Sequence, residues 1–169
     1  MTSAAMTPLS DADRISEIFQ YTVEAYKMFQ KLSEMLPNPM AAHVYENLAE
    51  DERATRDLIE IKYSDPRVPR TQITLEHDLR FQDALEGDLS YVELTEFLIV
   101  RETTMERRLV EAAKTASEAD RNLYLYIASA RRAHVAYMER ELQMLRLYPD
   151  WYKREDAESL VVFGRVGKA

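Results

Sequence analysis

The chain of 169 residues contains no cysteine. This absence excludes disulfide bonds, thiolate-bound metal sites and iron–sulfur clusters, because all of them need cysteine sulfur. Only three glycines occur, and two of them, Gly164 and Gly167, lie near the C-terminus. So few turn-forming residues, set among long stretches with helical periodicity, indicate a chain built from helices.

Positive charge is also scarce. The chain has 22 Lys and Arg against 30 Asp and Glu, which gives a formal net charge of −8. Nucleic-acid binding relies on a basic patch, so we expect no nucleic-acid partner. No apolar run approaches the roughly 20 residues that span a bilayer, and residues 1–10 lack the basic and apolar regions of a secretory signal. We therefore expect a cytoplasmic protein with no membrane partner.

Apolar residues recur at helical spacing along most of the chain. Asn38 followed by Pro39 is a capping residue with proline at the first helical position. Ser90 and Glu93 have the spacing of a capping box. We predict four helices, over residues about 11–36, 39–63, 91–116 and 119–147.

The connections between these helices indicate the topology. Short breaks after the first and third helices favour two antiparallel hairpins. Residues 64–90 form a long crossover, in which residues 75–85 could form a short helix. Two hairpins joined in this way complete a four-helix bundle. We therefore predict one all-α domain over residues 1–148 and a C-terminal tail over residues 149–169.

Two segments that lie 79 positions apart are similar in sequence. They are Tyr45–Thr55 and Tyr124–His134, in which Tyr, Leu or Ile, Ala, Arg and Ala recur in step. At their centres, Glu52-x-x-Thr55 corresponds to Arg131-x-x-His134. Residues three apart share one face of a helix. Each hairpin therefore directs a pair of polar groups toward the same interior.

Polar and charged residues interrupt the apolar stripe of every predicted helix at mid-height. They are Thr22, Glu52, Thr55, Glu102, Arg131 and His134. A buried charge is costly unless it meets a partner. Facing glutamates and histidines are also how four-helix bundles hold two iron or manganese ions. The sequence therefore indicates a central site of ionisable groups.

Residues about 11–147 resemble the rubrerythrin branch of the ferritin-like superfamily. Leu48–Thr55 (LAEDERAT) resembles the family's metal-binding segment of helix 2, and Ile127–His134 (IASARRAH) resembles its counterpart in helix 4. Glu102 stands where the carboxylate of helix 3 is expected. The resemblance implies a ferritin-like four-helix bundle, a non-haem diiron centre, and the reduction of peroxides or the handling of iron.

The sequence departs from the family's pattern at three of the six ligand positions. Thr22 stands in place of the helix 1 carboxylate, Thr55 in place of the helix 2 histidine, and Arg131 in place of the helix 4 glutamate. The positions that match are Glu52, Glu102 and His134. The resemblance therefore extends to the fold more fully than to the metal site.

Electrostatics suggests what replaces the metal ions. Two ionised carboxylates in a dry core repel each other and need a cation. Arg131 can supply it, because a guanidinium stays charged and can bind two carboxylates. Our hypothesis is a buried network of Glu52, Arg131 and Glu102 in place of a diiron centre. It would belong to a protein without a cofactor, which acts by interaction and not by catalysis.

The alternative is a metal-binding oxidoreductase or iron-handling protein of the rubrerythrin type. Glu52, Glu102 and His134 would then hold iron or manganese, and the resemblance implies peroxide reductase or ferroxidase activity. Rubrerythrins often carry a cysteine-rich rubredoxin segment, so a chain without cysteine would need a separate electron donor. Both hypotheses allow a homo-oligomer, formed through a face of the bundle or through the apolar part of the tail.

Overall fold

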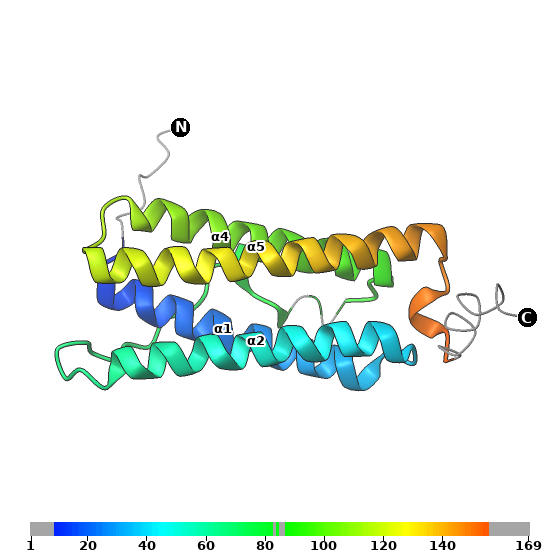
Figure 1. Cartoon of the computed structure of the whole chain (residues 1–169), viewed down its shortest axis with the longest axis horizontal. Coiled ribbons are helices and arrows are strands. Elements are labelled where there is room, and N and C mark those ends of the chain that lie inside the picture. Colours follow the sequence, from blue (N-terminus) through cyan, green and yellow to red (C-terminus); the bar gives the residue numbers. More distant parts are fainter. Residues whose placement is uncertain (1–8, 83, 85–86, 156–169) are drawn as a thin grey trace, which may run out of the picture.

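Four long helices dominate the computed structural model, which describes residues 9–82, 84 and 87–155 (Figure 1). They are α1 (Asp11–Met35), α2 (Pro39–Tyr63), α4 (Tyr91–Ala113) and α5 (Glu118–Leu147), and two 3-10 helices accompany them, η1 (His77–Leu79) and η2 (Trp151–Lys153). The described residues include no strand. The predicted all-α four-helix bundle is confirmed.

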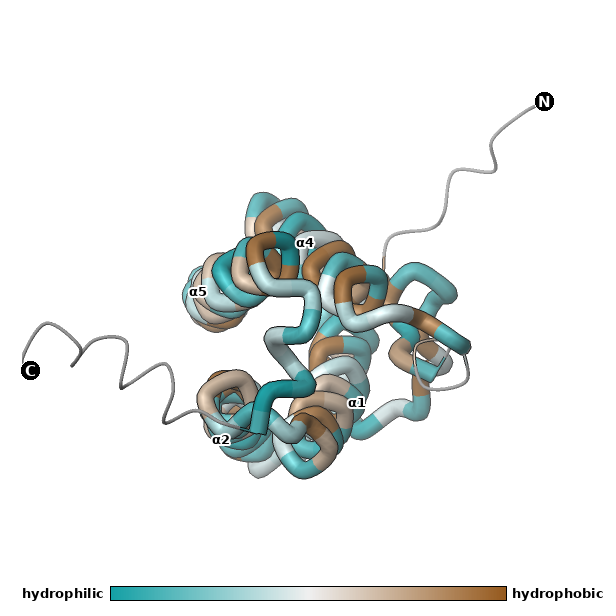
Figure 2. The backbone as a smooth tube through the Cα atoms, turned by 90° about the vertical axis from the view of Figure 1, so that its right-hand side faces the viewer, coloured by the Kyte–Doolittle hydropathy of each residue, from teal (hydrophilic) through white to brown (hydrophobic). Residues whose placement is uncertain are grey.

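The helices form two antiparallel hairpins, α1 with α2 and α4 with α5 (Figure 1). The two helices of a hairpin are in extensive contact, whereas α2 and α5 contact each other across the hairpins at fewer points. The crossover runs the length of the bundle, so α2 and α4 point in the same direction (Figure 1). Viewed end on, the helices occupy four corners, with the crossover beside α1 and α4 (Figure 2).

Side-chain caps define where the four long helices begin. Ser10 and Ser117 accept hydrogen bonds from backbone N–H groups in the first turns of α1 and α5, and Asn38 does so for α2. Ser90 and Glu93 form a complete capping box on α4. These side chains satisfy N–H groups that have no partner within the helix. For this reason the predicted helix starts lie within one residue of the observed ones.

The crossover differs from the prediction. Among the described residues of the predicted stretch 75–85, the 3-10 turn η1 occupies residues 77–79, and α-helical conformation appears only at residues 82 and 84. Arg101 of α4 donates to the carbonyls of Arg80 and His77, and Nε of Arg80 donates to the carbonyl of Leu75. Side-chain donors thus occupy carbonyls that a helix would use. Residues 83, 85 and 86 lie outside the described residues.

The start of the predicted tail packs against the bundle. The hydroxyls of Tyr152 and Tyr45 lie 2.8 Å apart, and Nδ2 of Asn38 donates to the carbonyl of Trp151 at 2.7 Å. Both aromatic residues of η2 are buried, so η2 closes one end of the core. The apolar part of the tail, residues 160–163, lies outside the described residues.

Among the described residues, none of the helices combines the length and the apolar character needed to cross a membrane.

Candidate functional site

Four ionisable side chains meet in the middle of the bundle. Glu52 comes from α2, Glu102 from α4, and Arg131 and His134 from α5. Each residue is 0% exposed. Arg131 and His134 are three positions apart, so one face of α5 presents both to the interior. These four residues are called the buried ion cluster below.

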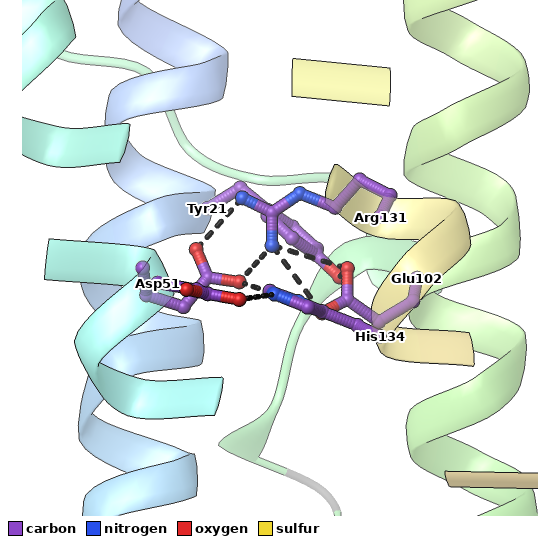
Figure 3. Close-up of polar contacts among 6 residues, drawn as sticks. Tyr21, Asp51, Glu102, Arg131 and His134 are labelled. Carbon is purple, nitrogen blue, oxygen red and sulfur yellow. Dashed lines mark hydrogen bonds and ion pairs between the residues drawn. The ribbon is translucent and has the colours of Figure 1, made fainter. Parts of the chain in front are cut away.

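The guanidinium of Arg131 lies between the two buried carboxylates (Figure 3). Its Nη2 donates to Oε2 of Glu52 at 2.7 Å, and its Nη1 contacts Oε1 of the same carboxylate. Nη1 also lies 3.3 and 3.2 Å from the two carboxylate oxygens of Glu102. The paired contact with Glu52 is the bidentate geometry that a guanidinium favours. Burial lowers the pKa of Arg131 to about 10, so the side chain remains charged at neutral pH.

Carboxylates face both ring nitrogens of His134. Nδ1 lies 3.1 Å from Oε1 of Glu102 and 3.3 Å from Oε1 of Glu52, and Nε2 lies 3.2 Å from Oδ2 of Asp51. Ionised carboxylates only accept hydrogen bonds, so both nitrogens must donate, which requires the imidazolium form. Burial pulls the pKa of His134 down, but the hydrogen bonds to Asp51 and Glu102 outweigh it and raise that pKa above its ordinary value.

The charges of the buried ion cluster therefore cancel. Glu52 and Glu102 contribute two negative charges, and Arg131 and protonated His134 contribute two positive ones. A buried charge is tolerated when it is paired and hydrogen-bonded. The cluster meets this condition without any added cation. The one exception within the cluster is Nε of Arg131, which is buried and has no hydrogen-bond partner among the described residues.

Sequence reasoning missed two residues of the site, Tyr21 and Asp51 (Figure 3). The Tyr21 hydroxyl donates to Oε2 of Glu102 at 3.1 Å, and its ring centre lies 5.1 Å from Cζ of Arg131, within cation–π range. Burial raises the pKa of Tyr21, and the charge of Glu102 raises it further. The hydroxyl therefore keeps its proton and remains a donor. The position of Tyr21 on the apolar stripe, next to Thr22, was the available signal.

The side chain of Asp51 is 62% exposed. Its carboxylate nevertheless reaches Nε2 of His134, and this hydrogen bond lowers the pKa of Asp51. Asp51 immediately precedes Glu52 in α2 and therefore lies about 100° around the helix from it. Only its side-chain conformation brings its carboxylate to the histidine. The sequence contains no signal for that conformation.

The two threonines at the predicted ligand positions do not join the cluster. Thr22 and Thr55 are buried, and the hydrogen bonds of the cluster, as far as the described residues show, involve neither of them. Oγ1 of Thr22 has no hydrogen-bond partner among the described residues. A neutral hydroxyl provides neither the charge nor the basicity of a carboxylate or imidazole ligand. The structure therefore leaves three metal-ligating residues at the centre.

These three residues fit a diiron centre poorly. Glu52, Glu102 and His134 offer ligand atoms within 4.8 Å of one another, a spacing that one small ion could accept. Two ions would need more ligands than this group offers, since carboxylate-bridged dimetal sites in bundles use side chains from all four helices. The guanidinium of Arg131 also holds positive charge between the carboxylates. A metal would have to displace it and to remove the proton of His134.

Comparison with known proteins bears on the fold. No protein-family model matches the chain, and no curated protein matches it. A solved structure of a hypothetical protein from Pyrococcus furiosus is similar, with a TM-score of 0.66 over 85% of this chain and 95% of that chain, at 17% sequence identity. This similarity supports the helical bundle and carries no information about activity.

Proposed function

We propose that this protein is a ferritin-like bundle of the rubrerythrin kind in which the buried ion cluster takes the place of a diiron centre. On this proposal the protein has no redox activity of its own and acts through its surface, as an interaction or assembly module. The observation that carries the proposal is the Arg131 guanidinium, which pairs with both Glu52 and Glu102 while all three side chains are 0% exposed.

An arginine and a metal centre can serve the same electrostatic purpose. Both neutralise carboxylates that the bundle buries, and both join helices from the two hairpins. A guanidinium, however, has no open coordination position and no second oxidation state. The replacement would therefore preserve the bundle while it removes the means to bind and reduce a peroxide.

Metal analysis tests the proposal directly. The protein is expressed in medium rich in iron and manganese, purified without chelators, and analysed by mass spectrometry for metal content. We expect far less than one metal ion per chain. One or more equivalents of iron or manganese that persist through purification would overturn the proposal. Arg131→Glu combined with Thr55→His and Thr22→Glu provides the positive control.

A second candidate is a site for a single metal ion, and the close spacing of Glu52, Glu102 and His134 favours it. Iron or manganese bound there would require a separate electron donor for any redox cycle, since the chain has no cysteine. Titration with Mn²⁺ or Fe²⁺ distinguishes the two candidates. Saturable one-to-one binding that His134→Gln abolishes, with peroxide-dependent oxidation of Fe²⁺, would support the second. If neither the binding nor the oxidation is observed, the metal-free candidate is supported.

A homo-oligomer stays a prediction. Large apolar side chains that are more than one-third exposed lie on α2 and α5, and they include Leu58, Ile61, Tyr126 and Tyr137. Sedimentation equilibrium over a hundredfold range of concentration measures the oligomeric state.

A further inference from the structure

A pocket of about 520 Å³ lies between α1 and the crossover, away from the buried ion cluster. One wall comes from residues 20–31 of α1, and the other from residues 73–75 and 80–82 of the crossover. Its volume falls in the range of about 300–1,000 Å³ that is usual for small-molecule sites. It is called the crossover pocket below.

The floor of the crossover pocket is apolar. Met28, Leu75 and Phe81 line it, and these residues are only 2–3% exposed because they also belong to the core. The ring of Phe81 packs against that of Tyr21 at a centroid distance of 5.2 Å. The floor is therefore firmly supported, and the partly buried Ile73 adds apolar surface to the lining.

The rim of the pocket is cationic. Among the described residues that line it, Lys27 and Lys31 of α1 and Arg80 of the crossover contribute three positive charges, against one carboxylate from Glu24. The ion pairs among the described residues include none of these three cations. In a chain with a net charge of −8, such a local excess is unusual. The mutual repulsion of three neighbouring cations is relieved when an anion binds among them.

Hydrogen bonds hold the crossover wall in place on both sides of the pocket. Oγ1 of Thr71 donates to Oδ1 of Asp13 at 3.1 Å and lies 2.9 Å from Oγ of Ser16, within hydrogen-bond distance. Beyond the pocket, Nε of Arg101 donates to the carbonyl of Arg80 at 2.9 Å. A ligand would meet a wall that is already ordered, so little of its binding energy would be spent on ordering the chain.

We propose that the crossover pocket binds an amphiphilic organic carboxylate, such as a medium-chain fatty acid. The carboxylate lies among Lys27, Lys31 and Arg80, and the apolar body lies along Ile73 and over the apolar floor. The apolar floor favours this class over small inorganic anions, which would leave the floor uncovered. This inference goes beyond the proposed function and does not depend on what the buried ion cluster does.

Isothermal titration calorimetry with octanoate and decanoate, each below its micelle concentration, tests the charge and the apolar body together. Decyltrimethylammonium, which has an alkyl chain of similar length and the opposite charge, is the control. We expect decanoate to bind one-to-one, about fourfold more tightly for each added methylene, which corresponds to about 0.8 kcal/mol per CH₂. The cationic amphiphile should bind at least tenfold more weakly. Equal binding of both amphiphiles, or no binding of decanoate, would overturn the proposal.

Matched variants locate the site. Lys27→Gln combined with Lys31→Gln removes two rim charges and should weaken decanoate binding at least tenfold. Lys114→Gln is the control, because this lysine lies at the end of α4 and its side chain is 64% exposed. Ile73→Ser changes a partly buried lining residue. It should weaken the binding of decanoate more than that of octanoate.

The melting temperature of each variant without ligand establishes that the fold is intact. Unchanged decanoate binding in the folded Lys27→Gln/Lys31→Gln variant would overturn the assignment to this pocket. Decanoate binding and metal content are separate measurements, so the failure of this proposal and the failure of the proposed function are distinguishable.

Discussion

At the residue scale, the arrangement around Arg131 explains how two buried glutamates remain charged. The guanidinium pairs with Glu52 and Glu102, and protonated His134 supplies the second positive charge. Such a cluster is weak evidence for net stabilisation relative to an apolar core of the same shape. Its members nevertheless depend strongly on one another, because the loss of one charge leaves another unpaired.

Arg131→Met should therefore destabilise the protein by about 3–5 kcal/mol, the usual cost of breaking a buried pair. The substitution keeps much of the side-chain volume and removes the charge, so the two carboxylates are left facing each other. Urea denaturation at pH 7, followed by circular dichroism, measures the change in the free energy of unfolding.

Arg132→Met is the matched control for that prediction. This neighbouring arginine pairs with Glu106 at the surface, and its side chain is 82% exposed. Its loss should change the free energy of unfolding by no more than about 0.5 kcal/mol. If the two variants are equally stable, Arg131 does not hold the two carboxylates in the way the structure shows.

His134 makes the stability of the fold depend on pH. Its pKa is raised in the folded protein, so the folded state holds this proton more tightly than the unfolded state does. The resulting stabilisation is fully present below the unfolded pKa of about 6.5 and is lost as the pH rises through the folded pKa. The difference in unfolding free energy between the wild type and His134→Gln should therefore shrink as the pH rises from 6 to 9.

Urea denaturation of both proteins across that pH range measures this difference. Asp51→Asn should move the decline to lower pH, because the hydrogen bond from Asp51 helps to raise the pKa of His134. A difference that grows with pH would show that His134 is neutral in the folded protein.

At the element scale, Asn38 joins the start of α2 to η2. Its Oδ1 accepts from the backbone N–H groups of Met40 and Ala41 at 2.9 and 3.2 Å, and its Nδ2 donates to the carbonyl of Trp151 at 2.7 Å. The side chain is therefore both a helix cap and a link to the C-terminal end of the described chain. Asn38 is also 0% exposed, so water cannot replace these bonds.

Asn38→Ala should lower the free energy of unfolding by more than the loss of an ordinary helix cap does. The cap contributes about 1 kcal/mol. The Trp151 carbonyl would keep only the longer bond from the Arg154 N–H at 3.3 Å, and the lost hydrogen bond adds about 0.5–1.5 kcal/mol. Ser117→Ala removes only the cap of α5 and should cost about 1 kcal/mol. Thermal melts of both variants provide the comparison. Equal melting temperatures would indicate that η2 does not depend on Asn38.

At the scale of the whole molecule, the buried ion cluster joins the two hairpins. Contact is extensive within each hairpin and sparser between α2 and α5, whereas Arg131 of α5 reaches Glu52 of α2 and Tyr21 of α1 reaches Glu102 of α4. Polar bonds thus connect α2 with α5 and α1 with α4, the helices that face each other across the two hairpins. The same central position would allow a metal centre to hold the hairpins together.

Introducing the ligand pattern of rubrerythrins tests the proposed replacement. Arg131→Glu, Thr55→His and Thr22→Glu together would provide six potential ligands from four helices, and the triple variant should bind iron or manganese. Bound metal stabilises the folded state, so its melting temperature should rise when metal is added and fall with a chelator. A folded triple variant that is insensitive to metal would argue against the alignment with rubrerythrins.

The sequence by itself determined the four helices, because periodicity and caps such as Ser90 with Glu93 are local and depend on neighbouring residues. It also placed Glu52, Glu102, Arg131 and His134 at one height, since helical spacing carries residue positions directly into space. Only the tertiary structure decided which atoms meet. The contacts of Tyr21 and Asp51, the docking of η2 and the crossover pocket depend on side-chain conformations and on partners far apart in the chain, which no local pattern encodes.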